Sequence, residues 1–190
     1  MNKLTSAPRL ALMLLVLLAV GCASSPRVTT DSDPAADFSR YRSFAFHEPL
    51  AVESQGYATP ASDRMKAAAR REMEARGYVY SESAPDLRVN INAYLSERSD
   101  VVNMPTLQHG FYYSYRARSY IAVPYWSNRS EVYHYTEGTL NVDLVDARAR
   151  RLVWEGVAVG RMARLKPAER AQRIDDTMAE IFAHYPHRAR

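Results

Sequence analysis

The side chains that could do acid–base, metal or nucleophilic chemistry are few and scattered along this sequence. Of five histidines, only His184 and His187 stand close together, on either side of Pro186. The sequence contains no H-E-x-x-H, no G-x-S-x-G and no glycine-rich phosphate loop, the spacings typical of metalloproteases, serine hydrolases and nucleotide-binding enzymes. Asp175 and Asp176 fit a solvated helix surface. We therefore predict no catalytic residue, no metal ligand and no cofactor.

The single cysteine has a position that gives it a specific chemistry. Cys22 follows a segment in which Lys3 and Arg9 precede an uncharged apolar run, residues 10–20. At ~1.5 Å per residue this run spans about half of a ~30 Å hydrocarbon core, which is too short for a transmembrane helix. It has the length of the apolar region of a secretory signal. We expect residues 1–21 to be a signal peptide, and a lone cysteine excludes a disulfide within the chain.

The residues around that cysteine resemble a bacterial lipobox, which a lipoprotein signal peptidase recognises. The segment reads Leu18, Ala19, Val20, Gly21 and Cys22. In such signals the peptidase cuts before the cysteine, which then carries acyl chains. More than one chain gives a lasting anchor, because each buried CH₂ contributes about 0.8 kcal/mol. Ala23 follows instead of aspartate, and the resemblance then implies the outer membrane, with the domain facing the periplasm. The alternative is an ordinary signal peptide followed by a chance cysteine.

The rest of the composition is that of one globular domain. Residues 22–36 are polar with two prolines, so we expect a flexible tether, and residues 37–190 form the single domain. Loss of Lys3 and Arg9 with the signal peptide lowers the basic residues from 25 to 23 against 21 acidic ones, a net charge of +2. This balance gives no electrostatic reason to expect a nucleic-acid partner.

An aromatic-rich segment, residues 97–134, is the strongest candidate for a recognition surface. Tyrosine and arginine supply rigid amphipathic contact area at binding surfaces. The candidate contacts are Tyr112, Tyr113, Tyr115, Arg116, Arg118, Tyr120, Tyr125 and Trp126. A connection this long in a small domain is uncommon and is usually functional or mobile. The segment would bind an envelope glycan, such as a peptidoglycan strand, or a partner protein; the alternative is a purely structural aromatic hairpin that packs on the sheet.

Hydrophobic periodicity predicts the elements that position this segment. Alternation of apolar and polar residues indicates strands, and apolar residues at helical spacing indicate helices. The expected elements are a strand containing Phe44 and Phe46, a helix capped by Ser62 and ended by Gly77, a strand at 86–96, a hairpin of 139–146 with 152–160, and a helix from Pro167 that Pro186 stops. We therefore expect an α+β fold: an antiparallel or mixed sheet of about four strands in the order β-α-β-β-β-α. Two helices would pack on one face, and the aromatic segment would be a long connection between strands 2 and 3.

Several blocks of sequence also resemble a known family. They are D-F-S-R-Y-R-S-F-A-F at 37–46, A-P-D-L-R-V-N-I at 84–91, Y-T-E-G-T-L-N-V-D-L-V-D at 135–146, R-L-V-W-E-G-V-A at 151–158 and I-F-A-H-Y-P at 181–186. This pattern resembles the domain-of-unknown-function 4136 family of bacterial lipoproteins. The resemblance implies a compact α/β domain of an exported lipoprotein, and it carries no established activity or catalytic residue.

Three functions are open at this point. The favoured one is a non-enzymatic, lipid-anchored binding or structural module of the cell envelope, which contacts the membrane through acylated Cys22. The second is an accessory subunit of an envelope assembly complex that pairs through a sheet edge. The third is an unrecognised hydrolase, which should show a pocket that gathers two titratable groups with shifted pKa values.

Overall fold

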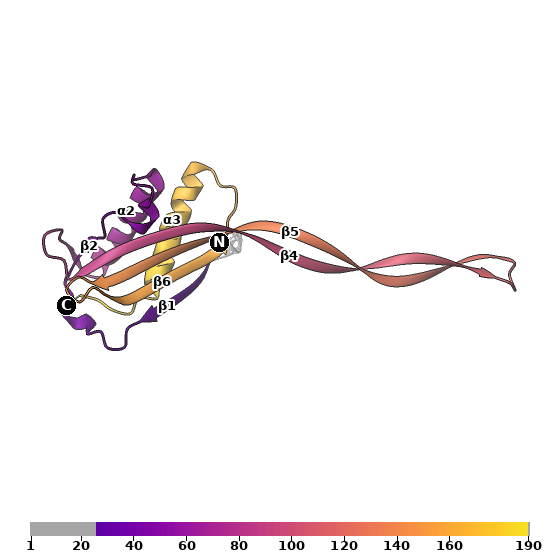
Figure 1. The fold of residues 1–190 in the computed structure, drawn as a ribbon, viewed down its shortest axis with the longest axis horizontal. Helices are drawn as coiled ribbons and strands as arrows, with labels where there is room; N and C mark the ends of the chain where they lie inside the picture. Colours follow the sequence, from indigo (N-terminus) through magenta and orange to yellow (C-terminus); the bar gives the residue numbers. More distant parts are fainter. Residues whose placement is uncertain (1–25, 190) are drawn as a thin grey trace, which may run out of the picture.

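The computed structural model describes residues 26–189 as a sheet with two helices on one side and a long hairpin that leaves the domain (Figure 1). The elements are β1 (Arg27–Ser32), the 3-10 helix η1 (Phe38–Arg40), β2 (Ser43–Phe46), the 3-10 helix η2 (Ala51–Glu53), α2 (Pro60–Ala75), β3 (Val79–Tyr80), β4 (Leu87–Ser114), β5 (Ser119–Asp146), β6 (Arg151–Arg161) and α3 (Pro167–Ala183). The sheet order is β1-β6-β5-β4-β2-β3, with β2 parallel to β3 and β4 and the other pairs antiparallel. Within residues 26–189, no helix has the length and apolar character needed to cross a membrane. The predicted α+β class, with two helices and a mixed sheet, is confirmed.

The core forms between the helices and alternate residues of the central strands. Side chains pointing to one side of a strand recur every second residue, and Leu87, Val89 and Ile91 of β4 are all fully buried. The matching positions on β5, β6 and α3 are Val142, Leu144, Trp154, Met178, Ile181 and Phe182. Full burial of each large side chain contributes about 1.5–3 kcal/mol, so these rows hold the helices on the sheet.

Gly156 lets helix α3 approach the sheet closely. A Cβ atom at this position would lie 2.5 Å from Cη2 of Trp154 and 2.6 Å from Cγ2 of Ile181. No real side chain fits into that space without displacing both neighbours. The V-W-E-G block therefore supplies both the largest core side chain and the gap in which helix α3 lies.

Helix α2 begins earlier than the sequence predicts. Thr59, not Ser62, is the N-cap: its hydroxyl accepts from the Ser62 backbone N–H at 3.0 Å, and Ser62 Oγ accepts from the Thr59 N–H at 2.8 Å. Pro60 occupies N1, where the missing N–H costs nothing. The predicted end is correct, since Gly77 follows the helix at φ +89°.

The sheet has six strands, so the expectation of about four is wrong. One addition is β1, which lies in the segment expected to be a flexible tether and pairs with β6 from Arg27↔Val159 to Ser32↔Trp154. Its sequence, R-V-T-T-D-S, does not alternate in polarity because an exposed edge strand is held mainly by ladder hydrogen bonds. The other addition is the two-residue β3. Residues 1–21, the predicted signal peptide, and the lipid-attachment residue Cys22 lie outside the described residues.

The predicted connection between strands 2 and 3 is itself β-structure. Strands β4 and β5 are 28 residues each and pair without interruption from Leu87↔Asp146 to Ser114↔Ser119. Residues 97–114 and 119–136, with the turn between them, form a twisted two-stranded ribbon that extends away from the domain (Figure 1). We call residues 97–136 the arm. The alternative of an aromatic hairpin is thus correct in its strands, but the hairpin extends from the sheet instead of packing on it. Because the arm has no core to face, its apolar residues do not alternate with polar ones.

Candidate functional site

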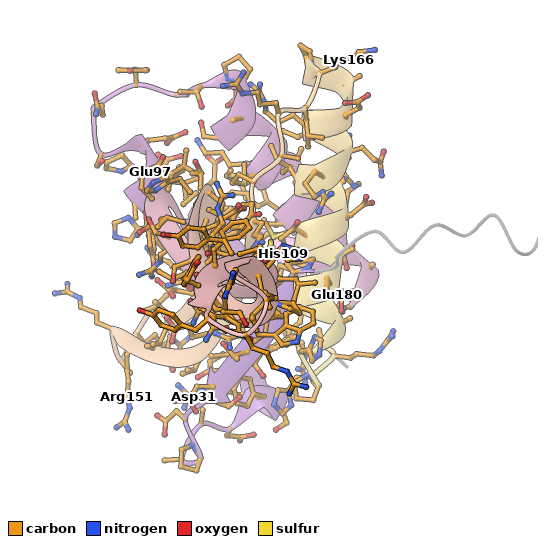
Figure 2. All side chains as sticks on the ribbon, turned by 90° about the vertical axis from the view of Figure 1, so that its right-hand side faces the viewer. Asp31, Glu97, His109, Arg151, Lys166 and Glu180 are labelled. Atoms are coloured by element: carbon orange, nitrogen blue, oxygen red, sulfur yellow. The ribbon has the colours of Figure 1, made fainter. Side chains whose placement is uncertain are left out.

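None of the residues of the arm is buried. Each of its strands contributes 18 residues, which at ~3.3 Å per residue gives a length of about 60 Å. The core contains no residue between Ala93 and Leu140. Figure 2, which looks along the arm toward the domain, shows side chains surrounding the ribbon, with His109 among them. A two-stranded hairpin without a covering layer is at best marginally stable in water, so an arm of this length suggests contact with something else.

The tip of the arm gathers three tyrosines. The ring of Tyr113 lies 5.2 Å from that of Tyr115 and 5.3 Å from that of Tyr120, at angles of 86° and 70°. Tyr115 is 87% exposed, and the turn includes Arg116 and Arg118, the latter at φ 49°. The structure therefore brings together five of the eight predicted contact residues at the tip, where the rings meet edge to face.

The other predicted contacts lie along the rest of the arm, on its two different faces. Residues directly opposite in an antiparallel ladder share a face, and each strand alternates between faces. Trp126, opposite Leu107 and 71% exposed, shares the face of Tyr113 and Tyr120. Tyr112 and Tyr125 lie on the other face. The eight residues thus do not form one surface, and both faces of the arm carry exposed aromatic rings.

Polar contacts between β4 and β5 fix the register of the arm between its base and its tip. Their hydrogen bonds join Ser99 to His134 (2.8 Å), Ser130 to Asn103 (2.7 Å) and Tyr125 to Gln108 (3.0 Å). Within β5, Tyr133 also donates to Glu131 at 2.8 Å, and this hydrogen bond raises the pKa of Tyr133.

The base of the arm is held by a residue that sequence reasoning missed. Arg161, at the end of β6, forms an ion pair with Asp100 and lies over the ring of Tyr135, 4.0 Å from its centroid. The contact joins residues 61 positions apart, and only the register of three strands reveals it. It holds the first turn of the ribbon against β6.

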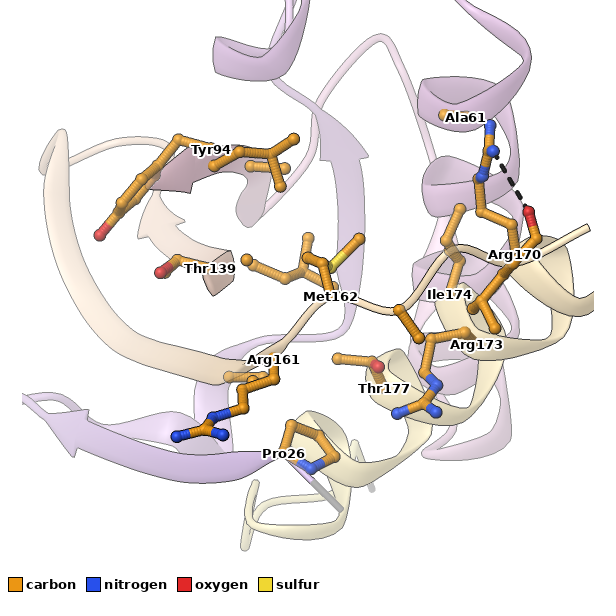
Figure 3. Close-up of a pocket in the computed structure, with 18 of the residues that line it drawn as sticks. Pro26, Ala61, Tyr94, Thr139, Arg161, Met162, Arg170, Arg173, Ile174 and Thr177 are labelled. Atoms are coloured by element: carbon orange, nitrogen blue, oxygen red, sulfur yellow. Dashed lines mark hydrogen bonds between the residues drawn. The ribbon is translucent and has the colours of Figure 1, made fainter. Parts of the chain in front are cut away.

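A cavity of about 250 Å³ lies beside the arm's base, between helix α3 and the end of the sheet (Figure 3). Its walls are mainly apolar. They include Met65, Ala93, Leu95, Gly138, Leu140, Ala158, Gly160, Met162, Leu165 and Ile174, with Pro26, Arg161, Arg170 and Arg173 also lining it. No carboxylate or histidine is among the residues that line this cavity.

None of the described titratable groups with a shifted pKa lines the cavity. Asp143 faces Glu155 across β5 and β6, and burial, aided by Glu155, raises the pKa of Asp143. Both carboxylates belong to the face of the sheet opposite the helices. In the part of the chain from 26 to 189, no three His, Cys, Asp or Glu side chains gather as a metal site. His184 contacts the Glu180 carbonyl, while His187 stacks on Phe38 with ring centroids 3.8 Å apart.

The fold and its most exposed element define an α+β domain with a projecting β-hairpin arm. The chain belongs to the DUF4136 family, a domain of unknown function, whose sequence profile matches residues 28–187. No curated protein matches the chain.

Two solved structures are similar in fold. One is a PDZ domain protein from Parabacteroides distasonis, with a TM-score of 0.55 and 13% identity over 87% of this chain and 36% of that chain. The other is a DUF4136 family protein from Bacteroides thetaiotaomicron, with a TM-score of 0.51 and 14% identity over 85% of this chain and 96% of that chain. This chain spans only about a third of the first protein. Identities this low support the fold alone.

Proposed function

We propose that this protein is a non-enzymatic binding protein of the bacterial cell envelope, anchored in the outer membrane through Cys22, and that the arm is its contact element. The observation that carries the proposal is the arm: about 60 Å of ribbon with exposed aromatic rings on both faces and no core residue. Exposed apolar surface of this extent typically marks an interaction site. The anchor is supported by the lipobox-like residues 18–22.

The arm is better suited to a protein than to a glycan. Among the described strands, residues 97–114 of β4 pair only with β5, and β5 pairs with β6 only from Glu137 onward, so both outer edges of the ribbon keep unpaired backbone groups. An extended segment of a partner can add to such an edge, with main-chain hydrogen bonds giving affinity. A sugar ring stacks best on one broad ring face, whereas Tyr113 meets its two neighbours at 86° and 70°. The arm would thus serve as an accessory contact in an envelope assembly.

Capture from envelope membranes tests the contact. The full-length lipidated protein and a Tyr125→Ala/Trp126→Ala variant are used as bait. Tyr57→Ala is the control, because Tyr57 is also exposed, at 62%, but lies on the domain. We expect a protein that the wild type and Tyr57→Ala capture and that the double variant loses. Equal capture by all three baits would contradict the role of the arm. Capture of peptidoglycan alone would replace the protein partner with a glycan.

The anchor is tested separately in cells. We expect radiolabelled palmitate to enter the wild-type protein and not a Cys22→Ser variant, and only the wild type to sediment with outer membranes. A mature protein whose mass corresponds to unmodified Cys22 would remove the anchor from the proposal.

A further inference from the structure

The cavity beside the arm is the unfilled end of the hydrophobic core. Deeper in the sheet, the core-facing rows carry large side chains such as Ile91, Val142 and Trp154. Toward the arm the same rows include several small residues beside Leu95 and Leu140. The small ones are Ala93 on β4, Gly138 on β5, and Ala158 and Gly160 on β6. The small side chains leave a hollow between the helices and this end of the sheet.

The mouth of this hollow is apolar and open. Leu95 is 67% exposed and Met162 46% exposed at its edge, although both lie beside the core. Its volume, about 250 Å³, is just below the ~300–1,000 Å³ typical of small-molecule pockets. The walls offer apolar contact and no buried charge, which suits a hydrocarbon chain better than a polar ligand.

The first described residue lines the same cavity. A Cβ on Gly160 would lie 3.4 Å from Cβ of Pro26, which places Pro26 at the mouth. Cys22 is four residues earlier, and four extended residues reach at most about 14 Å. An acyl chain on Cys22 therefore starts within reach of the cavity.

Cationic side chains flank this entrance. Figure 3 shows Arg161 and Arg173 on either side of Pro26. Arg161 is already paired with Asp100. Among residues 26–189, Arg173 has no ion-pair partner, so its guanidinium is available to ester carbonyl oxygens at the head of a lipid.

We infer that this cavity binds one acyl chain of the lipid carried by the chain's own Cys22. The inference rests on the proposed anchor, and it assigns the lipid a second role. An acyl chain held in the cavity would cover Leu95 and Met162 and fix the domain against its anchor. The remaining acyl chains would stay in the bilayer.

Photo-crosslinking of the intact lipidated protein tests this assignment. Cells are grown with a fatty acid that carries an alkyne and a diazirine, the protein is purified in mild detergent, and it is irradiated and digested. We expect intramolecular crosslinks to peptides containing Met162 or Ile174. Ala93→Leu fills the cavity and should lower this yield about tenfold, the effect of losing roughly two buried methylene groups. The control, Ala168→Leu, changes an exposed position on the same helix as Ile174 that does not line the cavity.

The outcomes separate this inference from the proposed anchor. Lipid on Cys22 with crosslinks only to detergent, to the arm's tip or to a second copy would overturn the inference and leave the anchor intact. An unmodified Cys22 would overturn both. Circular dichroism and the melting temperature of Ala93→Leu confirm that it folds; if it does not fold, the crosslink map of the wild type decides alone.

Discussion

Replacing Asp146 by alanine tests how the β5–β6 turn is fixed to the rest of the domain. The carboxylate is 3% exposed and accepts from Tyr41 Oη at 2.9 Å and from the backbone N–H groups of Arg148 and Ala149 at 2.9 and 2.8 Å. Arg40 forms an ion pair with it. Burial opposes ionisation of Asp146, but hydrogen bonds from Ala149, Tyr41 and Arg148 outweigh it and lower the pKa of the carboxyl.

The expected cost follows from what each partner loses. Asp146→Ala leaves the Tyr41 hydroxyl buried without its acceptor and removes the charged acceptor of two backbone donors. We therefore expect the free energy of unfolding to fall by about 3 kcal/mol. Tyr41→Phe removes one of these bonds and should cost about 1 kcal/mol. Replacing Arg40 by alanine should cost less than Asp146→Ala, because its side chain is 53% exposed and water screens the ion pair.

Urea unfolding at pH 7 measures these differences, and for Asp146→Ala the melting temperature should fall by roughly 10 °C. Because the folded-state pKa is lowered, the stabilisation by Asp146 is present above its unfolded pKa of about 4 and is lost as pH falls through the folded value. The gap between wild type and Asp146→Ala should therefore narrow at pH 3. If Arg40→Ala cost as much as Asp146→Ala, the ion pair rather than the hydrogen bonds would be the main contribution, and the reasoning would be refuted.

Three further predictions test other parts of the fold. Gly156→Ala should destabilise the protein by about 1–3 kcal/mol in urea, because the new methyl group meets both Trp154 and Ile181; a change near zero would show that helix α3 can retreat freely. Burial and the hydrogen bond to Asp146 raise the pKa of Tyr41 to about 12. The protonated Tyr41 hydroxyl therefore stabilises the folded state fully below pH 10, and this stabilisation is lost as the pH rises to 12. Alkaline unfolding should therefore show a larger loss for wild type than for Tyr41→Phe. Replacing residues 97–136 by Asn-Gly should leave the unfolding free energy within about 1 kcal/mol, since they contribute no core residue; a molten product by near-ultraviolet circular dichroism would contradict this.

The sequence predicts those elements whose residues face the core. Alternation from Leu87 to Ile91 marks the start of β4, and the spacing of Met178, Ile181 and Phe182 marks α3, because burial imposes the period of the backbone on the choice of residues. The hairpin of β5 and β6 follows for the same reason. Strand β1 was missed because an exposed edge strand selects for backbone pairing, which leaves little pattern in the side chains.

The arm shows the same limit at the candidate site. The sequence identifies the segment as unusual from its tyrosines, and the structure places Tyr113, Tyr115 and Tyr120 together at its tip. The sequence does not reveal that Tyr112 and Tyr125 lie on the opposite face, because a face is defined only once the register with the other strand is known. The contacts of Arg161 with Asp100 and Tyr135, and the cavity, depend on residues of different strands, so no local pattern could have predicted them.

The position of the anchor determines where the arm can find its partner. Pro26 lies beside Gly160 of β6. Gly160 pairs with Gly138 of β5, and Gly138 pairs with Leu95 of β4, two residues before the arm begins. If Cys22 carries lipid as proposed, Pro26 lies within about 14 Å of the anchored residue. The base of the arm is at this same end of the sheet, whereas the β5–β6 turn is at the far end. The arm then starts at the membrane and reaches about 60 Å from there. A fluorophore at position 96 should therefore be quenched by spin-labelled lipids far more strongly than one at position 147. Equal quenching at the two positions would show that the sheet lies along the bilayer, and the arm, which continues the direction of its strands, would then reach a partner at the membrane surface (Figure 1).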